Sequence, residues 1–177
     1  MSEVGSIAMS PVKVIAQKAT KLHAEALVAG FFQDDRPLAG LSAEIDWIHN
    51  GIISHLILRG RLRGTLKETT LLATQRKLHA NKILLIGLGK KDQLTPKILQ
   101  EVYSHIRHTL SQLHIKDYAV EWFGPTGPAV EEAKIVEAVR AGLGADPGRS
   151  IEMTLLVPDE EKAQRIRQRV QDATGDA

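Results

Sequence analysis

Two glycines one residue apart, Gly87 and Gly89, follow an apolar run and precede a charged turn, as in many phosphate-binding loops. A dinucleotide fingerprint needs a third glycine soon after the second, and Lys91 and Asp92 occupy that stretch instead. A P-loop is missing too, because no Gly-Lys-Ser/Thr ends the turn. We therefore interpret both glycines as a structural turn that lets the chain leave a buried strand sharply, and we expect no nucleotide there.

Other residue types that could do chemistry do not form a recognisable set. The acidic runs at 34–35, 131–132 and 159–161 fall in a turn and in two first helical turns, where negative charge complements the helix dipole. His105 and His108 are spaced for one helix face, but no third metal ligand is recognisable. Neither a Gly-x-Ser-x-Gly motif nor a cysteine is present. The sequence predicts no catalytic residue, no metal and no cofactor.

Basic residues are the strongest remaining signal. The segment 59–91 contains nine Lys or Arg against one acid, Glu68, so it carries +8 and leaves −6 for the rest of the chain. Such an asymmetry is a reason to consider a polyanion partner, but we favour the other interpretation, a solvated loop whose charge is balanced by neighbouring acids. Any DNA binding should be indifferent to sequence, because no base-reading pattern is visible. The candidate nucleic-acid-binding residues are Arg59, Arg61, Arg63, Lys67, Arg76 and Lys77.

Composition narrows the class of protein. The chain has 177 residues, of which 43% are hydrophobic and 25% charged, which is typical of one globular domain. No apolar run approaches the roughly 20 residues that span a bilayer. The first residues lack the basic start and apolar stretch of a secretory signal. We expect a cytoplasmic protein without a membrane partner.

The elements that must position these residues alternate along the chain. Strands are predicted at 11–17, 25–32, 69–74, 82–89, 117–123 and 151–157. Helices are predicted at 38–50, 52–60, 96–114, 129–143 and 159–170. This alternation predicts an α/β fold, a three-layer sandwich with a mixed, mostly parallel sheet and helices on both faces. Trp47 and Trp122 are interpreted as core or sheet-edge residues.

The predicted domain division has three parts. Residues 1–10 form a flexible N-terminus, and residues 11–158 form the α/β domain. Residues 159–177 form a terminal helix and tail, whose thin apolar stripe is typical of a helix that leads elsewhere.

One part of the sequence resembles a known family. The helix-pair stretch LSAEIDWIHNGIISHLILRGRLRGTLKET, the strand TTLLAT and the run LIGLGKKDQLT occur in the order and spacing of the N-terminal domain of the leucine (cytosol) aminopeptidases. The resemblance extends over about residues 25–157 and is densest over 38–113. It implies a macro-domain-like fold, which agrees with the elements above.

The resemblance does not extend to the family's catalytic chemistry. In that family the two metal ions are bound by a C-terminal domain marked by Asn-Thr-Asp-Ala-Glu-Gly-Arg and Thr-Phe-Asp-Ser-Gly-Gly runs, and neither run occurs in these 177 residues. The chain is thus expected to be a stand-alone, non-catalytic domain for binding, assembly or regulation, with a full-length aminopeptidase or a second copy as partner.

Three alternatives stay open. The chain could be the N-terminal part of a two-metal leucyl aminopeptidase. It could bind DNA through the basic segment, a role associated with bacterial members of the family. It could also be an enzyme or nucleotide reader that uses the macro-like pocket.

Overall fold

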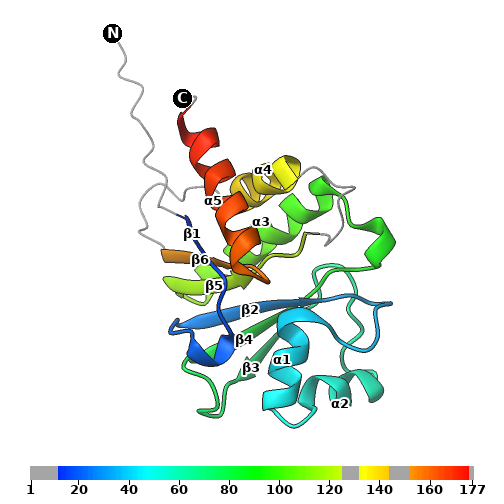
Figure 1. Ribbon diagram of the computed structural model, residues 1–177. Coiled ribbons are helices and arrows are strands. Elements are labelled where there is room, and N and C mark those ends of the chain that lie inside the picture. Colours follow the sequence, from blue (N-terminus) through cyan, green and yellow to red (C-terminus); the bar gives the residue numbers. More distant parts are fainter. Residues whose placement is uncertain (1–11, 125–131, 144–151, 176–177) are drawn as a thin grey trace.

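The computed structural model describes residues 12–124, 132–143 and 152–175 (Figure 1). The predicted flexible N-terminus at 1–10, most of the predicted turn after Gly124, the acidic residue Glu131 and the end of the predicted tail lie outside these ranges.

Six strands form one sheet in the order β1-β6-β5-β2-β4-β3. Strand β3 pairs antiparallel with β4, and every other neighbouring pair is parallel. The predicted α/β fold with a mixed, mostly parallel sheet is therefore confirmed. The strands are β1 (Val12–Ile15), β2 (Ala26–Phe31), β3 (Thr69–Ala73), β4 (Lys82–Gly87), β5 (Asp117–Glu121) and β6 (Glu152–Leu156).

Helices cover both faces of this sheet (Figure 1). Helices α3, α4 and α5 lie on one face, and α1 and α2 lie on the other. The helices are α1 (Gly40–Ile48), α2 (Ile52–Leu58), α3 (Pro96–Gln112), α4 (Glu132–Leu143) and α5 (Glu160–Gly175), with short 3₁₀ turns η1 (Ala19–Lys21) and η2 (Lys91–Gln93).

The central strands divide their side chains between two cores. On β4, Leu84 and Ile86 pack under the α3–α4–α5 layer, whereas Ile83 and Leu85 pack under α1 and α2. This alternation follows from the two-residue period of a strand. It explains why the predicted buried strand is apolar on consecutive residues, since both of its faces are covered.

Helix α3 begins where the sequence predicts. Thr95 caps it by accepting a hydrogen bond from the N–H of Ile98, and Pro96 occupies the first helical turn. Its buried face is formed by Leu99, Val102, Tyr103, Ile106 and Leu110. The predicted stripe is correct at its centre, while its last member, Leu113, is 38% exposed.

Two expectations need revision. Trp47 was expected in the core or at the sheet edge, and this was wrong, because it projects from α1 with 86% of its surface exposed. Helix α5 is longer than predicted and packs on the domain. Its residues Ala163 and Ile166 are fully buried, and the Arg167 side chain donates to the carbonyl of Val14 in β1 at 2.9 Å.

Candidate functional site

A crevice lies where β2, β4 and β5 end at their carboxyl edge. Its volume is about 470 Å³. In parallel α/β sheets this edge is where ligands usually bind, because the strand ends and the following loops diverge there. Its walls include Gly30, Phe32, Asp35, Ala39, Gly40, Leu88, Lys91, Glu121, Trp122, Phe123 and Gly124.

One wall of the crevice depends on Gly30 in the central strand. A Cβ at this position would lie 2.6 Å from the Phe123 ring and 2.8 Å from Leu88, closer than real side chains approach. Tyr103 also contacts that ring. Its hydroxyl donates to the carbonyl of Glu121 at 3.0 Å and accepts from the N–H of Phe123 at 3.1 Å, and the two rings stack at 5.2 Å. The position of the aromatic wall thus depends on both Gly30 and Tyr103.

The last residue of β5, Glu121, turns its carboxylate toward two other elements. Oε2 accepts a hydrogen bond from the N–H of Gly30 at 3.2 Å, and Oε1 accepts one from the N–H of Leu41 at 2.7 Å. The second bond places the carboxylate at the N-terminus of α1, where negative charge is stabilised. Gly40 is required here, because it has φ +60° and a Cβ would overlap Oε1.

The pKa of this carboxylate is unusually high for a glutamate. Burial raises the pKa of Glu121 to about 7, and the Glu44 carboxylate adds to the rise, while the hydrogen bonds from Leu41 and Gly30 oppose it. Glu121 is nonetheless only half-buried by exposed area, since it contributes to the wall of this crevice and of a second one next to it. Glu121 therefore combines a pKa near neutrality with a position that is partly accessible to solvent.

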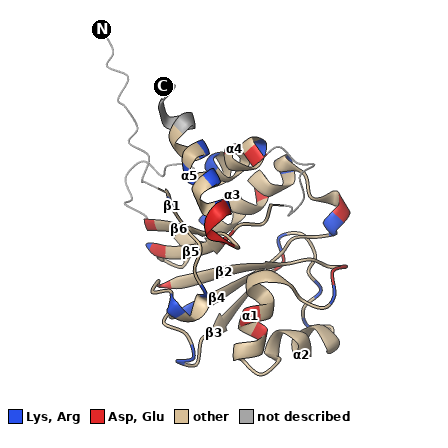
Figure 2. Cartoon of the chain, viewed as in Figure 1, with Lys and Arg blue, Asp and Glu red and all other residues tan. Residues whose placement is uncertain are grey.

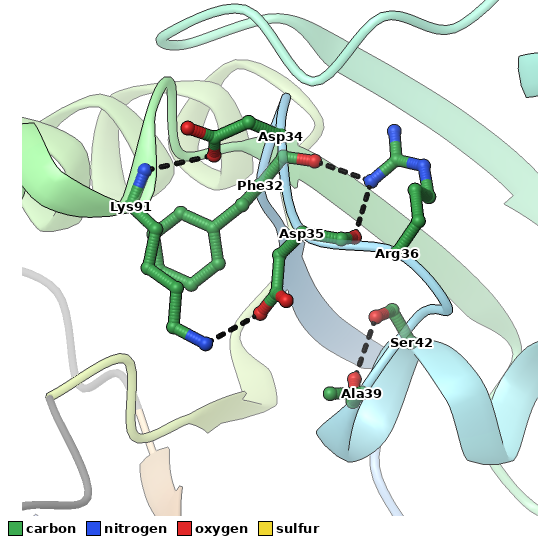
Figure 3. A network of polar contacts seen from close by, with 7 residues as sticks. All are labelled: Phe32, Asp34, Asp35, Arg36, Ala39, Ser42 and Lys91. Carbon is green, nitrogen blue, oxygen red and sulfur yellow. Dashed lines mark hydrogen bonds and ion pairs between the residues drawn. The ribbon is translucent and has the colours of Figure 1, made fainter.

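A network of polar contacts forms the rim of the crevice (Figure 3). Lys91 joins the ends of two strands: its N–H donates to Asp34 at 2.9 Å and its Nζ pairs with Asp35 at 2.7 Å. The same Nζ lies 5.9 Å from the centre of the Phe32 ring. Arg36 donates to the carbonyls of Phe32 and Asp35 at 2.6 and 2.7 Å. The acidic pair predicted to serve a turn thus anchors this rim.

Trp122 separates the crevice from a buried lysine. Its side chain is only 5% exposed, and its Nε1 has no hydrogen-bond partner among the described residues. That nitrogen faces Gly124, where a Cβ would overlap it. On the ring lies Lys162 of α5, whose Nζ is 5.3 Å from the ring centre. Burial lowers the pKa of Lys162, while Glu132 and Asp159 oppose this.

The predicted structural glycines lie beside the crevice at the end of β4. At Gly87 a Cβ would overlap the carbonyl oxygen of Thr65, so the neighbouring loop occupies the space of a side chain. Gly89 has φ +74°, and its carbonyl accepts the N–H of Gln33 at 2.8 Å. Both contacts are with this chain's own backbone, in keeping with a turn role for the two residues.

The structure separates the predicted basic residues. Arg59, Arg61 and Arg63 are exposed on the connection after α2, whereas Arg76 and Lys77 are exposed on the β3–β4 turn (Figure 2). Strand β3 lies between the two groups, and its five residues span about 17 Å. None of these five side chains forms an ion pair within the described ranges.

The sixth residue, Lys67, is not free. Its Nζ pairs with Glu101 of α3 at 2.9 Å, and that contact holds the pKa of Glu101 below its usual value. The six basic residues therefore form at least two separate surfaces, and Lys67 is engaged by an acid.

The remaining candidates keep structural roles in the described part of the chain. His105 is hydrogen-bonded to Thr69 Oγ1 at 2.7 Å, and His108 is exposed. Asp159 accepts the N–H of Lys162 at 2.8 Å and so caps α5. Across the described ranges, no group of three or more His, Cys, Asp or Glu is placed to hold a metal ion. Nor does any described helix combine the length and apolarity needed to cross a membrane.

Sequence reasoning missed Glu121. A carboxylate at the end of an otherwise apolar strand, before two aromatic residues, was the available signal. Alternation along β5 marks this position only as the strand's last residue, and the hydrogen bonds to Gly30 and Leu41 come from segments about 90 and 80 residues away.

The fold belongs to the macrodomain-like class of α/β proteins. A Trypanosoma brucei macrodomain in complex with ADP superposes with a TM-score of 0.69 at 12% identity, covering 89% of this chain and 67% of that one. A mutant of tomato leucine aminopeptidase superposes with a TM-score of 0.61 at 14% identity, covering 92% of this chain and 36% of that one. At such identities the likeness concerns the fold alone.

Sequence comparison defines the family. Residues 16–145 match the model of the cytosol aminopeptidase family, N-terminal domain, and the chain belongs to this family. A probable cytosol aminopeptidase of Haemophilus ducreyi is 28% identical over 114 residues, which are 58% of this chain and 23% of that protein. The corresponding protein of Idiomarina loihiensis is 28% identical over 126 residues, which are 64% of this chain and 25% of that protein. The chain thus corresponds to about a quarter of these relatives, and the family resemblance is confirmed.

Proposed function

We propose that this chain is a non-catalytic binding domain whose ligand lies in the crevice at the carboxyl ends of β2, β4 and β5. The observation that carries the proposal is the construction of this crevice. Gly30 leaves room for an aromatic wall, and a mainly apolar cavity of about 470 Å³ contains few polar groups, Glu121 among them. Small-molecule sites have this size and this balance of apolar and polar groups.

The proposal includes the absence of peptidase activity. The relatives are aminopeptidases, but the match is to their N-terminal domain, and the described residues provide no cluster of metal ligands. Purified protein with excess Mn²⁺ or Zn²⁺ is expected not to hydrolyse a leucine anilide above a metal-only blank. Turnover that copurifies with the protein and is abolished by a chelator would contradict this. We place the domain in the cytoplasm, as its family name suggests.

The binding role is tested by blocking the crevice. Ala39 lines it and is exposed, so Ala39→Phe fills the cavity with little effect on the core. Ala73→Phe on β3 is the matched control, because Ala73 is exposed and outside the crevice. The probes are phenethylamine, 2-phenylethanol, 3-phenylpropanoate and ADP, the last because a structural neighbour is in complex with it.

The readout is the indole N–H signal of Trp122 in NMR spectra, assigned by comparison with a Trp47→Phe variant. We expect at least one probe to shift this signal in the wild type and in Ala73→Phe but not in Ala39→Phe. If no probe shifts it, or if Ala39→Phe behaves like the wild type, the crevice is not a binding site.

Assembly with another protein is a second candidate role. Trp47 on α1 and Leu58 at the end of α2 are 86% and 85% exposed, which is unusual for large apolar side chains. We propose that this helix pair contacts a second copy or the catalytic part of an aminopeptidase. Sedimentation of the wild type and of a Trp47→Ser/Leu58→Ser variant, each alone and with a full-length relative, tests it. Identical sedimentation in all mixtures would remove this role.

A further inference from the structure

The carboxylate of Glu121 lacks a counter-charge. Its two hydrogen bonds come from backbone N–H groups, and no Lys or Arg of the described residues forms an ion pair with it. Charges that are partly withdrawn from water are usually paired in proteins, and Glu121 is half-buried with two backbone N–H groups as its compensation. The cationic Lys91 on the rim is already paired with Asp35 at 2.7 Å. The charge of the crevice therefore sums to −1 when Glu121 is ionised.

The N-terminus of α1, where an anion would ordinarily bind, is also already occupied. The N-terminus of α1 points toward the crevice, and such a terminus would ordinarily attract a phosphate or carboxylate. Here the N–H of Leu41 already donates to Glu121, and the Glu121 carboxylate occupies the space next to Gly40 where a side chain would lie. A ligand phosphate would meet the Glu121 carboxylate at that point. The Glu121 carboxylate thus occupies the position at the N-terminus of α1 where an anionic group of a ligand would otherwise bind.

The rest of the crevice suits an apolar body with one acceptor. Phe32, Phe123 and Leu88 supply apolar surface, and aromatic faces also attract cations. Lys91 Nζ lies 5.9 Å from the centre of the Phe32 ring, so this ring already contacts one cation, which Asp35 neutralises. The Trp122 Nε1–H is a donor without a partner in the described part of the chain, and it faces Gly124 of the crevice wall.

We propose that the crevice binds an apolar ligand that carries a positively charged amino group, with the ammonium paired to Glu121 and the apolar part between Phe32, Phe123 and Leu88. This inference rests on the proposed binding function and specifies its ligand class. It assigns Glu121 as the residue that selects cations and rejects anions. The pairing forms a charge-assisted hydrogen bond and supplies the missing counter-charge.

Three of the probes used above differ mainly in charge: phenethylamine is a cation, 2-phenylethanol is neutral and 3-phenylpropanoate is an anion. At pH 8 we expect phenethylamine to bind at least about tenfold more tightly than the alcohol, which corresponds to one charge-assisted contact. The carboxylate and ADP are expected not to compete. Equal binding of amine, alcohol and carboxylate, with loss of all three in Ala39→Phe, would overturn this inference and leave the binding function standing. Silence of all probes would remove both.

The wild-type protein alone provides a second test through pH. Amine binding requires ionised Glu121, so the affinity should fall about thirtyfold between pH 8 and pH 5.5. Calorimetry at pH 6 in two buffers of different ionisation enthalpy should show proton release on binding. The other titratable groups that face Glu121 or share its two crevices are Glu44, Tyr103, Asp35, Lys91, Lys18, Asp159 and Glu160.

A substitution tests whether Glu121 is the group that releases the proton on amine binding. Glu121→Gln should weaken amine binding at pH 8 at least about tenfold and abolish its pH dependence. Glu137→Gln, an exposed charge change on α4, is the matched control and should bind like the wild type. If Glu121→Gln fails to fold, proton release by the wild-type protein still tests the proposal. An affinity that is independent of pH and proceeds without proton release would overturn the proposal.

Discussion

The carboxyl-end crevice and the basic segment after α2 are built in opposite ways. In the crevice region, Gly87 and Gly40 leave room for other atoms, and the Glu121 carboxylate is held by two backbone N–H groups. On the basic segment, Arg59 and Arg61 project into solvent without ion-pair partners among the described residues. Changes at the closely packed residues of the first region should therefore alter stability, whereas changes in the second should alter only the binding of polyanions.

The largest effect on stability is expected at Gly87. A Cβ there overlaps the Thr65 carbonyl, a backbone atom that cannot rotate away, so Gly87→Ala should lower the free energy of unfolding by about 3 kcal/mol. Gly60→Ala is the control, because Gly60 has φ +65° and open space around it, and it should cost about 1 kcal/mol. Urea unfolding measures both. Equal losses would mean that the loop at Thr65 yields freely and that this end of the sheet is not tightly constrained.

The second effect depends on pH. Between pH 4.5 and about 7, folded protein holds a proton on Glu121 that the unfolded chain has released. The free energy of unfolding therefore falls as the pH rises through this range, and the loss is complete above pH 7. Glu121→Gln lacks this titration, so its stability relative to the wild type should improve by roughly 1–3 kcal/mol between pH 5 and pH 8.

Urea unfolding of both proteins at several pH values measures this difference. Glu137→Gln again serves as the control for a change of net charge. A constant difference between wild type and Glu121→Gln from pH 5 to pH 8 would show that Glu121 titrates normally and that the crevice resembles the exposed segment.

A smaller effect is expected at Gly89, where φ is +74° but the nearest atom to a Cβ is 3.5 Å away. Gly89→Ala should cost about 1 kcal/mol through backbone strain alone. It should change no affinity for ADP or ADP-ribose, since we predict a structural role for this turn. Calorimetric titration of wild type and variant checks this, and micromolar binding that Gly89→Ala removes would make the turn part of a nucleotide site.

The smallest effect on stability belongs to the basic segment. Replacing Arg59, Arg61 and Arg63 together by Ala should change the free energy of unfolding by less than about 0.5 kcal/mol per residue, because exposed side chains contribute little. If the segment binds duplex DNA, the triple change should flatten the log–log salt dependence by up to about three units. Anisotropy titrations at low salt measure it. Equal binding by wild type and variant, or none by either, leaves this segment a solvated surface.

Much of the fold was predictable from local pattern. The consecutive apolar residues of β4 and the Thr95-Pro96 helix start each express a local rule, and both elements lie where the sequence predicts them. The glycine turn follows the same logic, since φ +74° at Gly89 is a property of that residue's own backbone. Local sequence patterns predict these elements correctly because strand burial and helix capping depend on residues close in the chain.

The candidate site was less predictable, because it depends on contacts distant in sequence. In the sequence, Glu121 is only a polar residue at the end of a strand. Its contacts with Gly30 and Leu41 are visible only in the structure. Trp47 was expected to be covered on the basis of its side chain alone, and helix periodicity does not say whether another element lies over that face. The basic residues form one segment in sequence and separate surfaces in space, because β3 lies between them.

The place of β1 in the sheet constrains the order of folding. This strand is made before the other five strands of the sheet, yet β6 is the neighbour with which it pairs, through contacts such as Val12 with Met153. The ribosome must therefore deliver some 140 further residues before β1 can pair with β6, and β2 can pair with β4 well before that. Pairings so far apart in sequence form slowly, and an unpaired apolar strand is prone to aggregate meanwhile. The pairing of β1 with β6 is thus expected to be a late and slow step in the folding of this domain.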